Sequence, residues 1–315
     1  MVTTAERPLV SIVIPVMDRW ADLVRSLPSL SDQTYANYSV DVVALGGDGI
    51  PIMVHRSPRV RLLVLPRPRY LSFSWVRNVG AQYSEGDLLL FMNADNEWVD
   101  SSSMERAIDL LLCRREAEPH WYRDWREMCG FRRVRCRTAC PLAQYSIGVY
   151  GHAHGSILLV ERCAFMDVGG YDEMFSDWGF EDTDLLARLE CAGLARVALP
   201  GVIQRGHGDD ERLANFKVRD RNYTWHRNRL FSERSTRWCG CIHRPAGRPG
   251  IVSSVELRVG GRPQPLQSRG WMTGRTLLHQ RLLRRLLFGL CALQARISLP
   301  WLRDVTGDSY EDQVS

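Results

Sequence analysis

Four short apolar segments, separated by stretches with helical character, constrain what the N-terminal part of the chain can fold into. They are Val10–Pro15, Val40–Leu45, Val60–Leu65 and Gly86–Phe91. Continuous runs of valine, isoleucine and leucine of this length are typical of strands buried on both faces. Because the strands alternate with helices, we predict a mostly parallel α/β sheet flanked by helices. Ligands of such a sheet bind at the carboxyl ends of its strands.

The segments between and after these strands complete the predicted order of elements. Leu23, Leu27 and Leu30 have helical spacing, although Pro28 interrupts the pattern. Further predicted elements are a helix over 72–83, a strand and turn over 155–165, a helix over 182–191 and a strand over 197–203. Residues 113–150 are rich in arginine and aromatic residues without a clean period, so we expect a long excursion with some helix there.

Charge and cysteine usage limit the classes of function. The net charge of +5 is too small to indicate a nucleic-acid partner. Nine cysteines, an odd number without a framework spacing, are typical of a reduced compartment. Met1–Pro8 has no apolar leader, and the apolar run at Leu286–Leu293 is far shorter than the roughly 20 residues of a spanning helix. We expect a cytoplasmic protein and leave open a peripheral contact with a membrane.

Polar residues follow the fourth predicted strand, in the segment Asn93-Ala94-Asp95-Asn96. A carboxylate at this position lies where the ligand crevice of an α/β sheet opens. Oxygen ligands suit Mg²⁺ or Mn²⁺, which bridge diphosphates and neutralise the charge on a departing phosphate. The same residue types also form ordinary turns, so the segment by itself leaves both interpretations open.

An acidic run opens the predicted helix after Trp178, with Glu181, Asp182 and Asp184 in its first turn. The helix dipole stabilises acids in this position, which explains the run without any function. It does not explain the tryptophan–glycine pair just before the run. A carboxylate beside an aromatic platform suits the binding of a sugar hydroxyl and the removal of its proton.

His207 lies among glycines after another predicted strand. Such a histidine is either a structural residue or a metal ligand that complements Asp95. Two cysteine clusters lack a standard zinc spacing, so we predict ordinary reduced cysteines there. The clusters are Cys129, Cys136 and Cys140, and Cys239, Cys241 and His243.

Taken in order, these segments resemble the GT-A glycosyltransferases of family 2, whose fold is Rossmann-like. The N-terminal motifs of the resemblance are Val10-Ser-Ile-Val-Ile-Pro15, Gln33-Thr34-Tyr35, Trp75-Val-Arg77-Asn78 and Gly86-Asp-Leu-Leu-Leu-Phe-Met-Asn-Ala-Asp95. The second half is similar to a signature of galactosyl- and N-acetylgalactosaminyltransferases that chondroitin-polymerase-like enzymes share. That signature is carried by Gly169-Gly-Tyr-Asp-Glu173 and Trp178-Gly-Phe-Glu-Asp-Thr-Asp184. The resemblance covers residues 10–216.

The resemblance implies roles for the matching residues. Asp95 would hold Mn²⁺ or Mg²⁺, and His207 would complete the metal site. Asp182 would be the general base, and Glu181, beside Trp178, would bind the acceptor. Asp48 would contact the nucleobase and Arg77 would lie near the diphosphate. The whole nucleotide-sugar site would comprise Pro15, Asp48, Arg77, Asn93, Ala94 and Asp95.

One residue departs from the family pattern, because Asn93 stands where the metal motif has its first acid. We expect retained activity with an altered metal affinity or donor choice. The expected reaction is metal-dependent, inverting transfer of a hexosyl or N-acetylhexosaminyl group from a UDP-linked donor. The acceptor would be a hydroxyl of a carbohydrate, glycolipid or natural product. A retaining transferase of the same fold and a catalytically silent nucleotide-sugar-binding or scaffold protein remain alternatives.

The expected organisation is a single GT-A domain with an appendage. Residues 1–100 would bind the nucleotide sugar, residues 101–235 would bind the acceptor and residues 236–315 would form the appendage. A basic amphipathic helix is predicted over 274–297, where leucines alternate with arginines. This helix suits docking on the catalytic domain, a homodimer contact, or contact with an anionic membrane.

Overall fold

The described elements alternate between strands and helices in the N-terminal half. The strands are β1 (Val10–Val16), β2 (Tyr38–Leu45), β3 (Val60–Leu65), β4 (Leu88–Met92), β5 (Asn96–Trp98), β6 (Leu142–Ile147), β7 (Ile157–Glu161), β8 (Arg196–Gln204), β9 (Glu256–Val259) and β10 (Arg262–Gln264). The helices are α1 (Trp20–Ser31), α2 (Ile52–Arg56), α3 (Phe73–Tyr83), α4 (Ser103–Glu116), α6 (Arg162–Asp167), α7 (Glu181–Cys191), α8 (Asp209–Leu213), α9 (Arg221–Cys239) and α10 (Leu278–Thr306).

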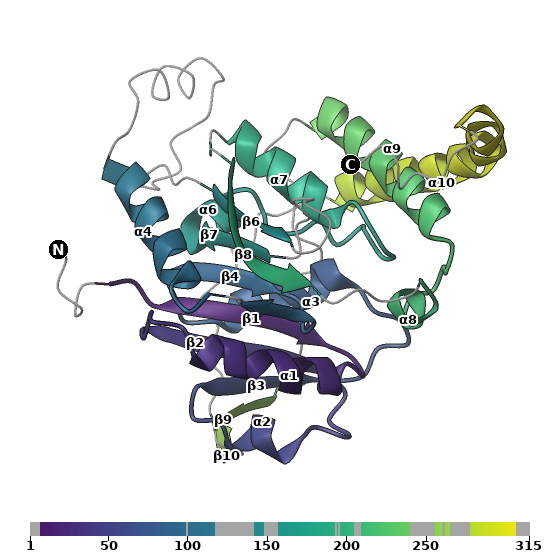
Figure 1. The fold of residues 1–315 in the computed structure, drawn as a ribbon. Coiled ribbons are helices and arrows are strands. Elements are labelled where there is room, and N and C mark those ends of the chain that lie inside the picture. Colours follow the sequence, from purple (N-terminus) through teal and green to yellow (C-terminus); the bar gives the residue numbers. More distant parts are fainter. Residues whose placement is uncertain are drawn as a thin grey trace.

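All described strands belong to one sheet of order β10-β9-β3-β2-β1-β4-β7-β6-β8-β5 (Figure 1). This computed structural model describes residues 7–98, 100–116, 142–147, 157–192, 194, 196–204, 209–239, 256–259, 262–264 and 278–306. The four neighbours β3, β2, β1 and β4 run parallel to one another. The predicted α/β sheet is therefore confirmed, and strands from the second half extend it in mixed directions.

Burial on both faces explains the continuous apolar runs of the parallel strands. Every residue of β1 is buried. Ile12 and Ile14 belong to a core that includes Leu23 of α1 and Ile108 of α4. Val13, which points the other way, belongs to a second core with residues of α3, α6 and α7. Since successive side chains of a strand point to opposite faces, one strand serves two cores and has no solvated face.

Close packing of α3 against the sheet is enforced by a glycine. A Cβ atom at Gly80 would lie 2.3 Å from Cγ1 of Val13, so no larger residue fits without a shift. The helix begins after Ser72, whose hydroxyl accepts a hydrogen bond from the Trp75 amide at 3.5 Å. Because α3 follows β3 and runs back along the sheet, its first turns lie at the carboxyl edge of the parallel strands, where ligands bind.

Several elements differ from the expectation. α1 continues through Pro28, because the apolar face of the helix is buried on both sides of the proline. Residues 113–150, expected to be an excursion with some helix, include the end of α4 and also the strand β6, which was not expected and pairs with β7 and β8. Residues 256–259 and 262–264, assigned to the appendage, form β9 and β10, and β9 pairs with β3. The expected boundary at residue 236 falls inside α9.

The C-terminal helix α10 is longer than expected, since it runs from Leu278 to Thr306. It lies beside α9, on the outer side of the molecule (Figure 1). Among the helices that the structure describes, none is both long enough and apolar enough to cross a membrane.

Candidate active site

The carboxyl ends of the parallel strands carry the first group of candidate residues. Pro15 is buried within β1. After β1, Asp18 adopts a left-handed conformation with φ of 61°. Its carboxylate accepts two hydrogen bonds from Arg67, which follows β3, and one of them measures 2.7 Å. Asp48 is exposed in the glycine-rich turn after β2. The edge thus presents charged side chains toward solvent where a nucleotide is expected.

A tight turn connects β4 to β5 and contains the candidate metal motif. The Asn93 amide donates to Oδ1 of Asn96 at 2.9 Å, and the Asn96 amide donates to the Asn93 carbonyl at 3.2 Å. Ala94 is buried and Asp95 is partly exposed. The two interpretations of this segment are compatible, because a turn held by the two asparagines still leaves the Asp95 side chain at the strand end.

Arg77, on the first turns of α3, connects this turn to the acidic run. Its side chain is buried, with 2% exposure. Nη2 donates to Oδ1 of Asn93 at 3.0 Å, and Nη1 donates to Oδ1 of Asp182 at 2.7 Å. Oε1 of Glu181 lies 3.5 Å from the same Nη1. One guanidinium therefore ties the end of β4 to the start of α7.

The two acids beside Arg77 differ in exposure. The Glu181 side chain is 9% exposed and that of Asp182 is 22% exposed. Burial, followed by the neighbouring charge of Asp182, raises the pKa of Glu181 to about 7 against the opposing effect of Arg77. Burial also raises the pKa of Asp182, although Arg77 and Tyr171 oppose this. Buried carboxylates with raised pKa values are suited to accept a proton near neutral pH.

The third acid of the run has a different environment. Asp184 is buried, and its carboxylate accepts from Nε of Arg188 at 2.9 Å and from the Ser232 hydroxyl at 2.6 Å. These contacts fix α7 against α9. Asp184 is therefore a structural residue, whereas Glu181 and Asp182 face Arg77.

A strained turn sets the direction of Glu181 and Asp182. Gly179 has φ of +94° and Phe180 has φ of 71°, so two consecutive residues are left-handed immediately before α7. This conformation is costly for phenylalanine and persists only where surrounding contacts impose it. The Phe180 ring packs edge-on against Trp225 of α9, with centroids 5.5 Å apart. A Cβ atom at Gly179 would lie 3.2 Å from the same indole.

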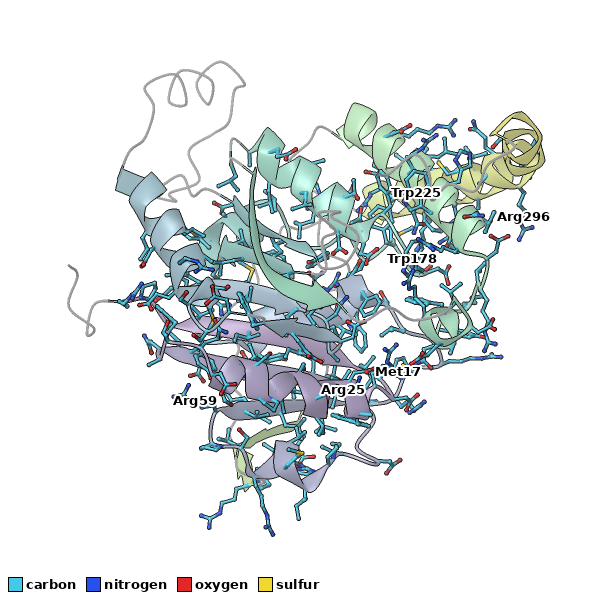
Figure 2. The ribbon with its side chains drawn as sticks, in the orientation of Figure 1. Met17, Arg25, Arg59, Trp178, Trp225 and Arg296 are labelled. Atoms are coloured by element: carbon cyan, nitrogen blue, oxygen red, sulfur yellow. The ribbon has the colours of Figure 1, made fainter. Side chains whose placement is uncertain are left out.

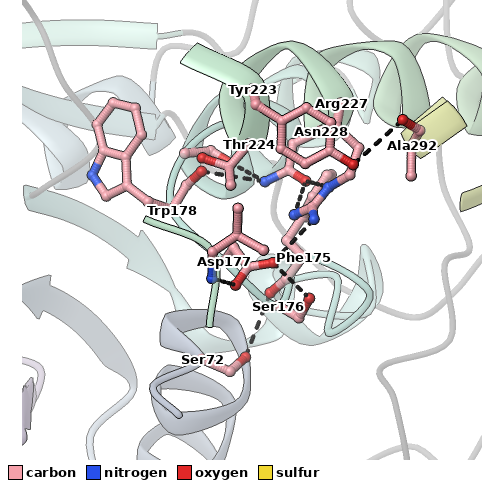
Figure 3. Close-up of polar contacts among 12 residues, drawn as sticks. Ser72, Phe175, Ser176, Asp177, Trp178, Tyr223, Thr224, Arg227, Asn228 and Ala292 are labelled. Atoms are coloured by element: carbon pink, nitrogen blue, oxygen red, sulfur yellow. Dashed lines mark hydrogen bonds and ion pairs between the residues drawn. The ribbon is translucent and has the colours of Figure 1, made fainter. Parts of the chain in front are cut away.

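Polar contacts from α9 hold the same turn (Figure 3). The buried Asn228 donates through Nδ2 to the Gly179 carbonyl at 2.7 Å, and its Oδ1 accepts from Arg227. Nη1 of Arg227 donates to Oδ2 of Asp177 at 3.0 Å, and Oδ1 of Asp177 accepts from the Val218 amide at 3.2 Å. We call Asp177, Arg227 and Asn228 the α9 clamp. The clamp fixes the backbone on which the acidic pair is mounted.

Tyr171 forms another wall of the site. Asn78 of α3 pairs with its backbone, donating to the Tyr171 carbonyl and accepting from the Tyr171 amide, both at 2.9 Å. The Tyr171 ring lies 5.0 Å from the guanidinium carbon of Arg77. Its buried hydroxyl faces Asp182 without a hydrogen bond of good geometry to any described residue. Burial raises the pKa of this hydroxyl, so it stays protonated.

The structure brings some of the predicted residues together and leaves others apart. Arg77, Asn93, Glu181 and Asp182 form one cluster. Trp178, three residues before α7, is partly exposed and stacks with the guanidinium of Arg221 at 4.7 Å. His207 and the cysteines at 129, 136, 140 and 241 lie outside the described residues, as does His243. Within the described ranges, no three metal-binding side chains come together.

The α9 clamp and the contact of Arg77 with the acidic pair were not predicted from the sequence. The clamp residues Arg227 and Asn228 lie about fifty positions after the turn they hold. The only sequence signal was the pair Trp178 and Gly179 before the acidic run, because a glycine there indicates a left-handed turn that other residues must support.

Two family models match the chain. Residues 11–112 match glycosyl transferase family 2. Residues 138–209 match a model described as the N-terminal domain of galactosyltransferase. The chain is a glycosyltransferase, similar over these ranges to family 2 and to galactosyltransferases. Its α/β sheet, flanked by helices, is the GT-A arrangement expected of such an enzyme. The first match ends within α4, and the second includes β7, α7 and the acidic pair.

Other comparisons of this glycosyltransferase are more distant. A solved structure of the mannosyltransferase PcManGT from Pyrobaculum calidifontis, in complex with GDP-Man and Mn²⁺, is 16% identical and has a TM-score of 0.48. That similarity covers 98% of this chain and 79% of the mannosyltransferase chain. No curated protein matches the sequence.

Proposed function

We propose that this glycosyltransferase moves a hexosyl or N-acetylhexosaminyl group from a UDP-linked sugar to an acceptor hydroxyl, with inversion. The observation that carries the proposal is the bridge formed by Arg77. Its guanidinium contacts Asn93 at the end of β4 and both acids at the start of α7. The bridge joins the expected donor side of the site to a carboxylate pair suited to acid–base chemistry.

In the proposed step, the acceptor hydroxyl oxygen attacks the anomeric carbon and its proton passes to Asp182. The bond between the anomeric carbon and the diphosphate oxygen breaks, and UDP leaves with the electron pair. Asp182 suits the role of base better than Glu181, because its carboxylate is the more exposed of the two. Burial raises the pKa of Asp182 toward neutral pH, and a general base is most effective when its pKa lies near the working pH.

We assign acceptor binding to Glu181 and Trp178. Glu181 is buried beside Asp182, and its pKa of about 7 lets it accept or donate a hydrogen bond to an acceptor hydroxyl near neutral pH. The partly exposed indole of Trp178 offers an apolar face to a sugar ring. The α9 clamp would hold both groups in one orientation, which favours a reactive geometry.

We propose Asp95 and His207 as ligands of Mn²⁺ or Mg²⁺. Asn96 pairs with Gln204 across β5 and β8. In the sequence, Asp95 directly precedes Asn96 and His207 is three residues after Gln204. A carboxylate and an imidazole leave other coordination positions for diphosphate oxygens and water, as these cations prefer. The cation, when bound, would neutralise charge on the diphosphate. Asp48 and Arg77 remain our candidates for nucleobase and diphosphate contacts.

The proposal is tested by incubating the full-length protein with a panel of nucleotide sugars and Mn²⁺ and measuring release of the nucleotide. We expect turnover of at least one UDP-sugar, which Asp182→Asn abolishes or strongly reduces. Turnover of GDP-sugars alone would contradict the donor assignment. The anomeric configuration of the product, measured by NMR, separates inversion from retention.

A catalytically silent nucleotide-sugar-binding protein is the second candidate. It is favoured by Asn93, whose side-chain oxygen accepts from Arg77 where the family motif has an acid. Binding of UDP with no release of nucleotide from any donor in the panel would support this candidate over the enzyme.

A further inference from the structure

One face of α10 docks on the glycosyltransferase. Leu287 and Cys291 are buried in a small core with Phe175 and with Phe231 of α9. Arg284 is buried and forms an ion pair with Asp172. On the next turns, the Tyr223 hydroxyl of α9 donates to the Ala292 carbonyl at 3.3 Å (Figure 3). These contacts fix the orientation of the helix without using its other face.

The other face of α10 is an exposed apolar stripe. Five large aliphatic side chains on it are between 46% and 65% exposed. They follow one another at spacings of three and four residues, which keeps them on one side of a helix. At 1.5 Å per residue, the stripe is about 21 Å long. Its members, which we call the leucine stripe, are Leu283, Leu286, Leu290, Leu293 and Ile297.

The charges that border the leucine stripe are positive. Arg285 and Arg296 are exposed on the same helix. Figure 2 shows Arg296 at the outer edge of the molecule, away from the sheet. From Leu278 to Arg303 the sequence contains no aspartate or glutamate. Over this range the helix therefore combines an apolar stripe with a basic border and has no acidic residue.

These charges distinguish between two occupants of the stripe. A second copy of the chain would set stripe against stripe, and the arginines of both copies would border the same contact without an acid between Leu278 and Arg303 to pair with them. The exposed area of five such side chains is also smaller than the roughly 800 Å² per partner that a standard stable interface buries. An anionic lipid surface satisfies both features, because leucines enter the acyl boundary while arginines meet the headgroups.

We propose that the leucine stripe of α10 is a docking surface for an anionic membrane, with the helix lying in the plane of the interface. The proposal does not depend on the transfer reaction proposed above. Since α9 lies against α10 on one side and holds the acidic turn on the other, a membrane bound to α10 would lie one helix layer from that turn.

The test is flotation of the full-length protein with vesicles of phosphatidylcholine alone or mixed with phosphatidylglycerol. We expect flotation with the mixed vesicles only, weakening as salt is raised. The partition coefficient onto mixed vesicles should fall at least about tenfold for the variant Leu286→Ser/Leu290→Ser/Leu293→Ser, because three apolar side chains no longer enter the membrane. The matched control is Ile52→Ser/Met53→Ser, which alters two exposed apolar residues of α2 and should float like the wild type.

Two checks keep the experiment decisive. The far-UV circular dichroism of the triple variant should match the wild type, because the replaced side chains are exposed. Arg285→Gln/Arg296→Gln should reduce flotation and its dependence on salt. Absence of wild-type flotation with anionic vesicles, or equal flotation of the triple variant, would overturn the proposal. A wild-type dimer that the triple variant converts to a monomer, without vesicle binding, would assign the stripe to a second copy instead.

Discussion

Replacing Glu181 by glutamine should stabilise the folded protein above neutral pH. In the wild type, burial and the neighbouring Asp182 raise the pKa of Glu181 from its ordinary value of 4.5 to about 7. Between these two pH values the folded state therefore binds more protons than the unfolded state, and the free energy of unfolding falls as pH rises. Glutamine keeps the shape of the side chain and removes this titration.

The magnitude follows from the size of the shift. One pKa unit corresponds to about 1.4 kcal/mol, so a shift from 4.5 to about 7 corresponds to roughly 3 kcal/mol. No large reduction for solvent screening applies, because the side chain is 9% exposed. The free energy of unfolding of Glu181→Gln, taken relative to that of the wild type, should rise by up to about 3 kcal/mol from pH 5 to pH 8. The attraction between ionised Glu181 and Arg77 already lowers this pKa, so its loss in the variant is included in the difference.

The assay is urea unfolding of both proteins at pH 5 and pH 8, followed by tryptophan fluorescence. The control is Glu190→Gln, which alters an exposed acid at the other end of α7. We expect the difference between variant and wild type to change with pH for Glu181→Gln and not for the control. A Glu181→Gln variant whose stability follows the wild type in parallel at the two pH values would refute the reasoning.

Three further changes test other parts of the site. Arg77→Leu should lower the free energy of unfolding by roughly 3–5 kcal/mol in urea titrations, because it leaves buried acids without their partner. A loss smaller than that caused by the same replacement of an exposed arginine would contradict this. Asn228→Ala should lower the free energy of unfolding by about 1–3 kcal/mol, since the Gly179 carbonyl loses its donor. The rate of nucleotide release should fall, while the affinity for UDP, measured by calorimetry, is retained. Asp95→Ala should abolish Mn²⁺-dependent UDP binding, and unchanged binding would remove the metal assignment.

The sequence was sufficient to predict the parallel strands, because burial on both faces leaves a continuous apolar signal. β3 was predicted with the bounds that the structure has, and β1 and β2 within two residues. β9 was missed because its pairing with β3 joins segments almost two hundred residues apart. β6 was missed because its short sequence, Leu-Ala-Gln-Tyr-Ser-Ile, alternates weakly and adjoins a segment without periodicity.

The site was predicted less completely than the fold. The acidic pair was found because two acids and an aromatic residue at a helix start form a local pattern. Its contact with Arg77 depends on how closely α3 packs on the sheet, which Gly80 allows and no local pattern reveals. Asn228 was missed for a similar reason, since a single asparagine within a long polar helix carries no signal until the turn it holds is known.

The most direct test of the central claim is the single-turnover rate of donor cleavage by Asp182→Asn. Asparagine preserves the size of the side chain and its contact with Arg77 but cannot accept the proton. A positioned base typically contributes 10²–10⁴-fold, so we predict a loss of about that size with unchanged affinity for UDP. The neighbouring exposed residue provides the control, Thr183→Ala, which should keep the wild-type rate. A near-native rate for Asp182→Asn would contradict the assignment of Asp182 as the base.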